Sequence, residues 1–416
     1  MENEKVQQCH DLFIKLIRGY LTGEMEVNEE FENADWNKLH ELAYRTGLTP
    51  MLCEPVKKVY SRYPFKTDIY QRFINGTIVM ALKEETKIEY VERIVKAAAE
   101  KDIQVLVFKG PIIADAYKDY RMRVSSDTDM YVDEKDKDAM MEILESLGYQ
   151  WLQDKSKNHV QNLTIPNVHY VELHTALWED FKGSRIKVLE SFELTAPKNR
   201  ICDKFCGIML DTIRHEEQLI YFVYHFAKHM VLESASIRNV MDILLFYKKH
   251  KDKIDESSFK ERLERLGYWK CFCILCQIGE EYLGFKKEDL PCYAKTDSES
   301  LDQVLRVLFS EQVTRDDDIY RWQMVYNMTP YLTGDYDPNM SGVKRKLKYL
   351  FPTRSNMPEK YSYAKKSAFL VPIAWVHRIF DYIVSRFFKR NYRMAGSKRM
   401  SRMDAKLQVL KKMKLI

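Results

Sequence analysis

The spacing of apolar residues predicts helices at both ends of the chain. An apolar residue recurs every three or four positions, the period of an amphipathic helix, through Val6–Leu21 and Ile88–Ala99. Asp35, a residue type that commonly caps a helix N-terminus, precedes another such run. The period returns in four later segments, namely Glu216–Val231, Ser236–Lys249, Phe259–Gly267 and Trp269–Leu283. We therefore expect a mostly helical chain.

Between these helical runs, short apolar segments predict a small sheet. Val105–Phe108 has the continuous apolar character of a buried strand, Lys109-Gly110 follows as a turn, and Pro111 starts a helix through Tyr117. The next predicted elements are an apolar strand through Val132, a covering helix and a short strand, over Met130–Val132, Lys135–Leu147 and Tyr149–Leu152.

Two further strands, His159–Ile165 and Val168–His174, are joined by the turn residues Pro166-Asn167. Side chains alternate between the two faces of a strand, so Glu172 and His174 share one face, and Val171 and Leu173 share the other. Since the apolar face belongs to the core, we expect Glu172 to point toward a site. The whole pattern predicts an α+β fold, with a small mixed sheet embedded in a mostly helical chain.

Asp127 and Asp129 point most directly to chemistry. The same alternation places both carboxylates on one face of the strand that continues through Met130. Carboxylates held so close repel each other unless Mg²⁺ or a cationic partner neutralises them. We therefore expect a divalent metal site here, with Glu172 as a third carboxylate.

The Lys109-Gly110 turn is the predicted phosphate position. A strand, a glycine turn and a helix start bring main-chain N–H groups to one point, and Lys109 adds a positive charge. A phosphate there would face the aspartate pair, which would hold a metal that bridges phosphate oxygens.

Together these motifs resemble the polymerase-β-type nucleotidyltransferases, and most of all the branch of uncharacterised nucleotidyltransferase family proteins. The motifs lie within Ala97–Leu177 and comprise Lys109-Gly110, Arg123, Ser126-Asp127-x-Asp129, Gly148-Tyr149 and Glu172-Leu-His174. The resemblance implies a small polymerase-β-like core in which Asp127 and Asp129 bind Mg²⁺ and Glu172 supplies the third carboxylate. It also implies that Gly110 and Ser126 lie near the triphosphate. For Arg123 we expect contact with phosphate or with Asp127.

The leading hypothesis is Mg²⁺-dependent transfer of a nucleoside monophosphate from a nucleoside triphosphate to an acceptor hydroxyl. The acceptor stays open among a sugar phosphate, a protein hydroxyl, a small alcohol and a nucleic-acid end. His174, His225 and His229 are candidates for the acceptor side. Helical packing and salt-bridging are the favoured explanation of His225 and His229, together with Arg238 and Asp242.

Two alternatives remain. Members of the wider superfamily usually carry Gly-Ser or Gly-Gly where this chain has Gly110-Pro111, so a hydroxyl and an N–H donor are missing. This difference favours a degenerate core that binds a nucleotide, or nothing, while other regions recruit a partner. In the other alternative, Asp127 and Asp129 only pair with Lys109 and Arg123 in a buried ion cluster.

Composition limits the class of protein. With 416 residues and 45% hydrophobic content, the chain can form two or three domains with cores of their own. Its polar N-terminus is not that of a cleaved signal peptide, and eight scattered cysteines suit a reducing compartment, so we expect a cytoplasmic protein. Core packing is the favoured role of Cys271, Cys273 and Cys276, in preference to zinc binding.

Charge is concentrated at the C-terminus, where residues 341–416 hold 20 Lys and Arg against 3 Asp and Glu. Charged residues interrupt the apolar segment Phe369–Phe388, so we do not expect it to span a membrane. A basic amphipathic helix can lie on an anionic membrane or nucleic acid, or pack on the protein with a solvated basic face. The predicted regions are N-terminal helices (1–85), the nucleotidyltransferase core (86–200), a helical domain (201–290), a helix with a linker (291–340) and the basic tail (341–416).

Overall fold

The computed structural model describes residues 2–152, 160–178, 183–232, 235–292, 295–309, 328–329, 332–334, 351–354, 357, 361–388 and 406–415. The chain divides into two compact units. The first comprises Met1–Asp180, Val188–Phe226 and Ala235–Phe309, and the second comprises Phe181–Lys187, Ala227–Ser234 and Ser310–Ile416.

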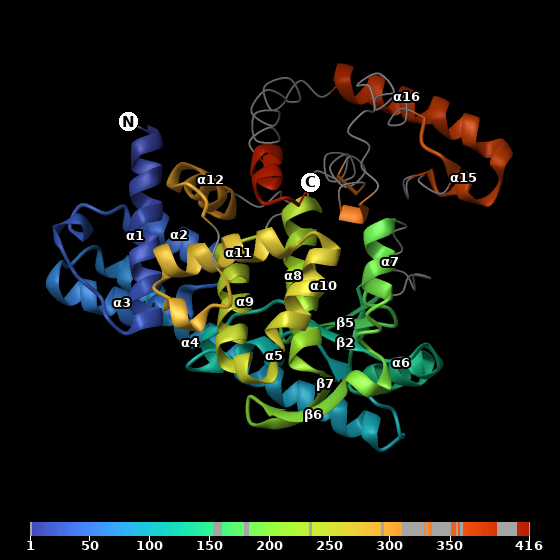
Figure 1. Cartoon of the computed structure of the whole chain (residues 1–416), viewed down its shortest axis with the longest axis horizontal. Helices are drawn as coiled ribbons and strands as arrows, with labels where there is room; N and C mark the ends of the chain where they lie inside the picture. Colours follow the sequence, from blue (N-terminus) through green and yellow to red (C-terminus); the bar gives the residue numbers. More distant parts are fainter. Residues whose placement is uncertain are drawn as a thin grey trace. The chain divides into compact units, whose positions relative to one another are not determined.

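The first unit contains a mixed five-stranded sheet in the order β1-β2-β5-β4-β3, of which Figure 1 labels β2 and β5. Its strands are β1 (Leu106–Val107), β2 (Thr128–Tyr131), β3 (Gln150–Trp151), β4 (Val160–Ile165) and β5 (His169–His174). β2 and β5 are parallel, and the other neighbouring strands are antiparallel. The predicted α+β class with a mixed sheet is confirmed.

The predicted hairpin forms β4 and β5. Val171 and Leu173 are fully buried, as the alternation predicted. Asn167 in the turn has a φ of 62°, a left-handed conformation that asparagine tolerates better than most residues. The first residue predicted for this hairpin, His159, lies outside the described residues.

Helices make up most of the rest of the described chain (Figure 1). In chain order they are α1 (Glu2–Thr22), α2 (Trp36–Thr46), α3 (Thr49–Arg62), α4 (Thr67–Ala99), α5 (Pro111–Ala114), α6 (Lys137–Ser146), α7 (Ser184–Glu190), α8 (His215–Leu232), α9 (Ile237–His250), α10 (Glu256–Leu266), α11 (Trp269–Ile278), α12 (Ser298–Phe309), α15 (Tyr363–Lys366) and α16 (Val371–Phe388). At the start of α2, the Asp35 carboxylate accepts a hydrogen bond from the Lys38 N–H, so the predicted cap is confirmed.

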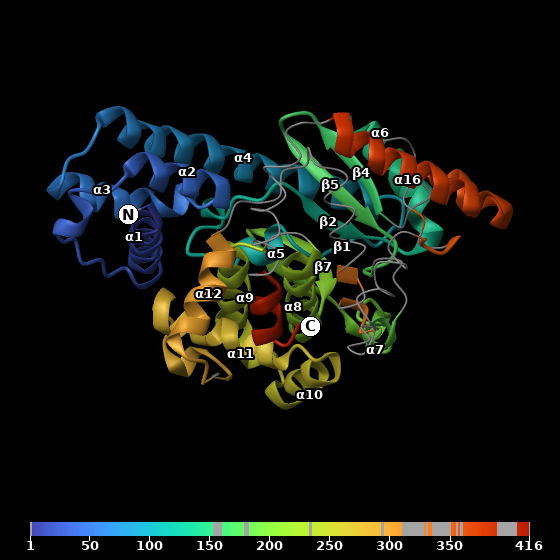
Figure 2. The ribbon, with the colours of Figure 1, turned by 90° about the horizontal axis from the view of Figure 1, so that it is seen from above.

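α4 lies on the face of the sheet that carries the apolar residues, and α6 packs against α4 (both helices are labelled in Figure 2). Tyr90 of α4 has its ring centroid 6.2 Å from that of His169 in β5. Both ring nitrogens of His169 form hydrogen bonds, Nε2 with the Thr128 hydroxyl and Nδ1 with the Tyr149 hydroxyl. Asp129 and Glu172 therefore lie on the opposite face of the sheet.

Two local structures differ from the prediction. The helix after Gly110 was expected to reach Tyr117, but α5 ends at Ala114. No strand was predicted just before α8, where β6 (Arg200–Phe205) and β7 (Ile208–Ile213) form a second hairpin. The Thr212 hydroxyl of β7 donates to the Val107 carbonyl of β1, so this hairpin covers an edge of the main sheet.

In the second unit, the described residues include a small core beneath α16. It consists of Met357, Tyr361, Ala364, Val371 and Ala374. In the described part of the chain, every helix is too short or too polar to cross a bilayer, in agreement with the prediction for Phe369–Phe388.

Candidate active site

The pairing of β2 with β5 places Asp129 directly beside Glu172. In this parallel register Asp129 faces Glu172 and Tyr131 faces His174. Since side chains two residues apart share a face, Asp129, Glu172 and His174 project from the same side of the sheet. One ligand atom from each of the three lies within 4.8 Å of the other two. Strand register alone thus brings together three potential metal ligands.

His174 lies between the two carboxylates. Its Nε2 is 3.3 Å from Asp129 Oδ1 and 3.7 Å from Glu172 Oε2, yet this buried nitrogen makes no well-aligned hydrogen bond. Burial alone would lower the pKa of His174, but attraction to Asp129 and Glu172 outweighs burial and raises it. A buried imidazole nitrogen beside two carboxylates has the donor chemistry of a metal ligand.

Lys109 partly neutralises this cluster. Its Nζ lies 2.8 Å from Asp129 Oδ2, 3.9 Å from Asp127 Oδ2 and 2.9 Å from His225 Nε2. Burial alone would lower the pKa of Lys109, but the carboxylates raise it. Burial alone would likewise raise the pKa of Asp129, which Lys109 and His174 instead hold below its ordinary value. At the centre of the site, the buried Lys109 and His174 therefore offset the negative charge of the buried Asp129.

Asp127 and Glu172 are the accessible carboxylates of the site, each with about a third of its side chain exposed. The Ser126 hydroxyl donates to Asp127 Oδ1 at 3.0 Å. The Tyr170 hydroxyl lies 3.3 Å from Glu172 Oε1 and 2.9 Å from Asn162 Oδ1. Short local contacts therefore orient both carboxylates while leaving them open to solvent.

The loop before Asp127 is held by two helices. From α4, Glu84 accepts a hydrogen bond from the Ser125 N–H at 3.0 Å, and Lys87 donates to the Ser125 carbonyl. From α9, Arg238 donates to the Val124 carbonyl. Glu84 and Lys87 also form a buried ion pair 2.6 Å long. This double attachment fixes the backbone that carries the aspartates.

Arg123 lies in a buried cluster of its own. Its Nε and Nη2 each donate to the Asp242 carboxylate of α9 at 2.9 Å, and the Tyr117 hydroxyl donates to Asp242 Oδ1 at 2.6 Å. The ion pair is bidentate, the geometry in which arginine binds carboxylates most specifically. The predicted contact of Arg123 with phosphate or with Asp127 stays a prediction. In the structure Arg123 pairs with Asp242, for which an ion-pairing role was predicted.

Gly110 has a backbone conformation that suits glycine alone. Its φ of 63° and ψ of −111° lie outside the regions allowed for other residues. A Cβ at this position would lie 3.3 Å from Thr128 Oγ1. The turn therefore keeps Lys109 close to β2, so that its side chain reaches the carboxylates.

α8 supplies further groups beside the carboxylates. Its His225 contacts Lys109, and His229 follows one turn later, half-buried. Tyr221 of the same helix is buried, and burial together with Asp129 and Glu172 raises the pKa of its hydroxyl. The assignment of His225 and His229 to the acceptor side stays a prediction.

Several residues that shape the site were not predicted. They are Glu84 and Lys87 of α4, Tyr170 of β5 and Tyr221 of α8. Glu84 and Lys87 are charged residues within a helical run, a pattern that also describes any solvated helix face, so the sequence carries no signal for them. Tyr170 could have been found, because it precedes Glu172 by two residues and therefore shares its face.

The cysteines do not contribute to this cluster. Cys271 and Cys276 are fully buried in α11 and Cys273 nearly so, which agrees with the predicted core packing. Among the residues that the structure describes, the group that could hold a metal is the one formed by Asp129, Glu172 and His174. Its carboxylates suit Mg²⁺ or Mn²⁺, and its imidazole also suits softer divalent ions.

The model of a family described as an uncharacterised nucleotidyltransferase matches residues 32–284, which include the sheet and the helices α2–α11. No curated protein and no solved structure matches the chain.

Proposed function

Because the chain belongs to an uncharacterised nucleotidyltransferase family, we propose that it transfers a nucleoside monophosphate from a nucleoside triphosphate to an acceptor hydroxyl. Asp127, Asp129 and Glu172 are the proposed ligands of a divalent metal, with Mg²⁺ as the expected ion. His174, first considered for the acceptor side, is better explained as a fourth ligand or as a group that orients the carboxylates.

The proposal rests on the pairing of Asp129 with Glu172 across two strands. Asp129 and Glu172 are 43 positions apart in the numbering and nevertheless face each other across the parallel pair β2 and β5. Without a cation, desolvation of the buried Asp129 and its repulsion from the neighbouring Glu172 both disfavour this arrangement. The arrangement is therefore best explained as a binding site for positive charge.

The transfer itself is a displacement at phosphorus. The acceptor oxygen forms a bond to the α-phosphorus, the bond from that phosphorus to the oxygen bridging the β-phosphate breaks, and pyrophosphate leaves. Glu172, which is oriented and partly exposed, accepts the proton of the acceptor hydroxyl. A divalent ion at the carboxylates would stabilise the negative charge that develops on the phosphate oxygens.

Lys109 is proposed to have two roles. In the structure its ammonium group balances the charges of Asp127 and Asp129. We propose that the same ammonium group, next to the Gly110 turn, contacts phosphate oxygens of a bound triphosphate. Ser126 and Gly110 are proposed to line the triphosphate site. For Arg123 a positioning role is favoured, because Asp242 already satisfies two of its donors.

A non-catalytic function is the competing proposal. Two observations favour it, namely the proline at position 111, which lacks an N–H donor, and the direct contact of Lys109 with Asp129. In this case the site binds a nucleotide without turning it over, or keeps its carboxylates neutralised by Lys109 alone.

Two measurements on purified protein distinguish these proposals. Isothermal titration with Mg²⁺ and ATP tests metal-dependent binding, and incubation of labelled triphosphates with a cell extract tests transfer to an acceptor. We expect metal-dependent binding and a labelled product. In the Asp129→Asn variant, both should fall by at least about a hundredfold.

Asp252→Asn is the matched control, because Asp252 is an exposed aspartate outside the site. It should bind and react as the wild type does. Nucleotide binding without product would favour the non-catalytic proposal. Absence of any metal-dependent binding would contradict the transferase proposal and would favour carboxylates neutralised by Lys109 alone.

A further inference from the structure

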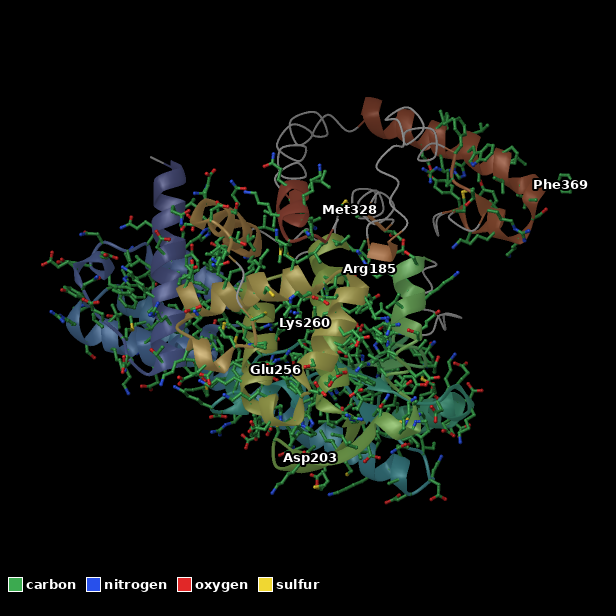
Figure 3. The ribbon with its side chains drawn as sticks, in the orientation of Figure 1. Arg185, Asp203, Glu256, Lys260, Met328 and Phe369 are labelled. Atoms are coloured by element: carbon green, nitrogen blue, oxygen red, sulfur yellow. The ribbon has the colours of Figure 1, made fainter. Side chains whose placement is uncertain are left out.

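The outer face of α16 carries a continuous apolar stripe. Phe369, just before the helix, is 91% exposed, and Ile373, Val376 and Phe380 are 58%, 68% and 64% exposed. Their spacing of four, three and four residues places them on one side of a helix. In Figure 3 the labelled ring of Phe369 projects away from the ribbon of α15 and α16.

This stripe is not needed for the core of the second unit. The inner face of α16 already packs through Val371 and Ala374 against Tyr361 and Ala364. The Trp375 indole N–H donates to the Pro352 carbonyl at 2.9 Å, which further attaches the inner side. The helix is thus apolar on two faces, and only one of them contributes to the core.

The sequence extends the stripe beyond the residues already named. Positions 383 and 387, which continue the same spacing, are isoleucine and phenylalanine. The backbone of α16 is helical through Phe388. An exposed apolar stripe such as that of Phe369, Ile373, Val376 and Phe380 commonly marks a surface that binds a partner or a membrane.

The net charge of this part of the chain indicates which kind of partner the stripe binds. Residues 341–416 contain 20 basic and 3 acidic residues, so the segment of the sequence that includes α16 has a strongly positive net charge. Asp381, the acidic residue within α16, accepts a hydrogen bond from the Tyr361 hydroxyl and lies 3.7 Å from His377 Nε2. Lys365 and Lys366 are exposed just before the stripe. A protein surface that bound this region would need both an apolar groove and acidic side chains, whereas an anionic bilayer offers both properties in any orientation.

We propose that α16 lies in the plane of an anionic membrane surface, with Phe369, Ile373, Val376 and Phe380 inserted at the boundary of the acyl chains. Lys365 and Lys366, which are exposed, then contact lipid headgroups. Interfacial helices of this type combine burial of apolar area with attraction to anionic lipids. The proposal is independent of the proposed nucleotidyl transfer, since it uses none of the residues of that site.

Co-sedimentation of the full-length protein with lipid vesicles tests the proposal. One set of vesicles contains phosphatidylcholine alone, and the other contains phosphatidylcholine mixed with phosphatidylserine. We expect at least about tenfold stronger binding to the mixed vesicles. The triple variant Phe369→Ser, Val376→Ser, Phe380→Ser should lose about tenfold or more of this binding.

Met209→Ser is the matched control, because Met209 is an exposed apolar residue of β7, in the other unit. This variant should bind vesicles as the wild type does. A second variant, Lys365→Glu with Lys366→Glu, leaves the apolar stripe intact and should weaken binding to the mixed vesicles several-fold. Thermal unfolding of each variant verifies that the second unit keeps its fold.

Three results would overturn the proposal. Equal binding to both kinds of vesicle would remove the role of charge, and unchanged binding of the folded triple variant would remove the role of the stripe. Self-association of the wild type that the triple variant abolishes, without binding to vesicles, would show that the stripe contacts a second copy of the chain.

Discussion

At the scale of single residues, the site is defined by what surrounds its carboxylates. Lys109 approaches Asp129 from the adjacent turn, and His174 approaches the same carboxylate from the neighbouring strand. Positive or polarisable groups therefore contact Asp129 on both sides. This environment explains why a buried aspartate keeps a pKa below its ordinary value although burial alone would raise it.

The imidazole of His174 predicts a preference among metals. Imidazole binds Mn²⁺ and softer ions better than it binds Mg²⁺, which strongly prefers oxygen ligands. We expect His174→Gln to weaken Mn²⁺ binding about tenfold while Mg²⁺ binding changes less. Isothermal titration with each ion measures the two affinities. Equal loss for both ions would indicate that His174 only orients Asp129 and Glu172.

The Arg123–Asp242 pair predicts a large effect on stability. Both side chains are buried, so removal of Asp242 leaves an uncompensated guanidinium in the interior. We expect Asp242→Ala to lower the free energy of unfolding by about 3 kcal/mol, as measured by denaturant titration. Asp252→Ala, at an exposed position, should change it by less than about 0.5 kcal/mol. Similar values for the two variants would contradict this assignment.

The sequence predicted that Asp129 and Glu172 come together, which the structure shows, but it did not predict all of their partners. The period-two alternation was sufficient to place Glu172 and His174 on one face, and the structure agrees. It could not show that Arg123 pairs with Asp242, because the two residues are 119 positions apart and only tertiary packing brings them together. For the same reason Glu84 and Lys87 were missed.

At the scale of secondary-structure elements, the turn between β1 and α5 determines the position of Lys109. We expect Gly110→Ala to destabilise the protein by about 1–3 kcal/mol, because an L-residue is strained at this φ and ψ. The added methyl group would also press on Thr128. Metal binding should weaken as well, since the Lys109–Asp129 contact would shift.

The Gly148→Ala variant separates the effect of backbone strain from the effect of a steric contact. Gly148 also has a positive φ, of 91°, but a Cβ there would meet no atom within 4 Å. This variant should lose stability through backbone strain alone and should bind metal as the wild type does. Thermal unfolding and isothermal titration of the two variants check the comparison, and impaired metal binding in both would contradict it.

Long periodic segments were predicted well, and short elements were not. α1, α2, α8 and α9 extend over enough residues for the helical period to be recognised. The hairpin of β6 and β7 was missed because its strands contain charged residues such as Asp203 and Lys204, which obscure the alternation. Its turn is formed by Cys206 and Gly207, both with positive φ, and cysteine gives no warning of such a conformation.

At the scale of the whole molecule, three buried histidines predict how stability depends on pH. Burial lowers the pKa of His169 to about 3, of His215 to about 4 and of His250 to about 3. The unfolded chain binds protons at these residues near pH 6.5, whereas the folded chain does not. Their contribution to stability is therefore complete above pH 6.5 and is lost as the pH falls from 6.5 toward 3. His174, whose pKa is raised, acts in the opposite direction, because its contribution is lost as the pH rises.

Replacing one of these histidines should reduce the dependence on pH. We expect the free energy of unfolding of His169→Gln to fall less between pH 6.5 and 4 than that of the wild type, by about 2 kcal/mol. His377→Gln, at a partly exposed position, serves as the control and should follow the wild type. Denaturant titrations at several pH values measure these slopes. If the free energy of unfolding changed with pH equally in His169→Gln and the wild type, His169 would not contribute to the pH dependence of stability.

The length of α4 has a practical consequence for truncation. The helix has 33 residues, which corresponds to about 50 Å, and it runs without interruption through residue 85, where a domain boundary was predicted. Its early residues Ile69 and Phe73 are buried, and its later residues Glu84 and Lys87 hold the loop that carries the aspartates. A shortened chain that began at residue 86 would keep every proposed metal ligand. It would lose Glu84, one of the two residues of α4 that hold the loop before the aspartates. Biochemical work on the proposed metal ligands therefore requires the N-terminal helices as well.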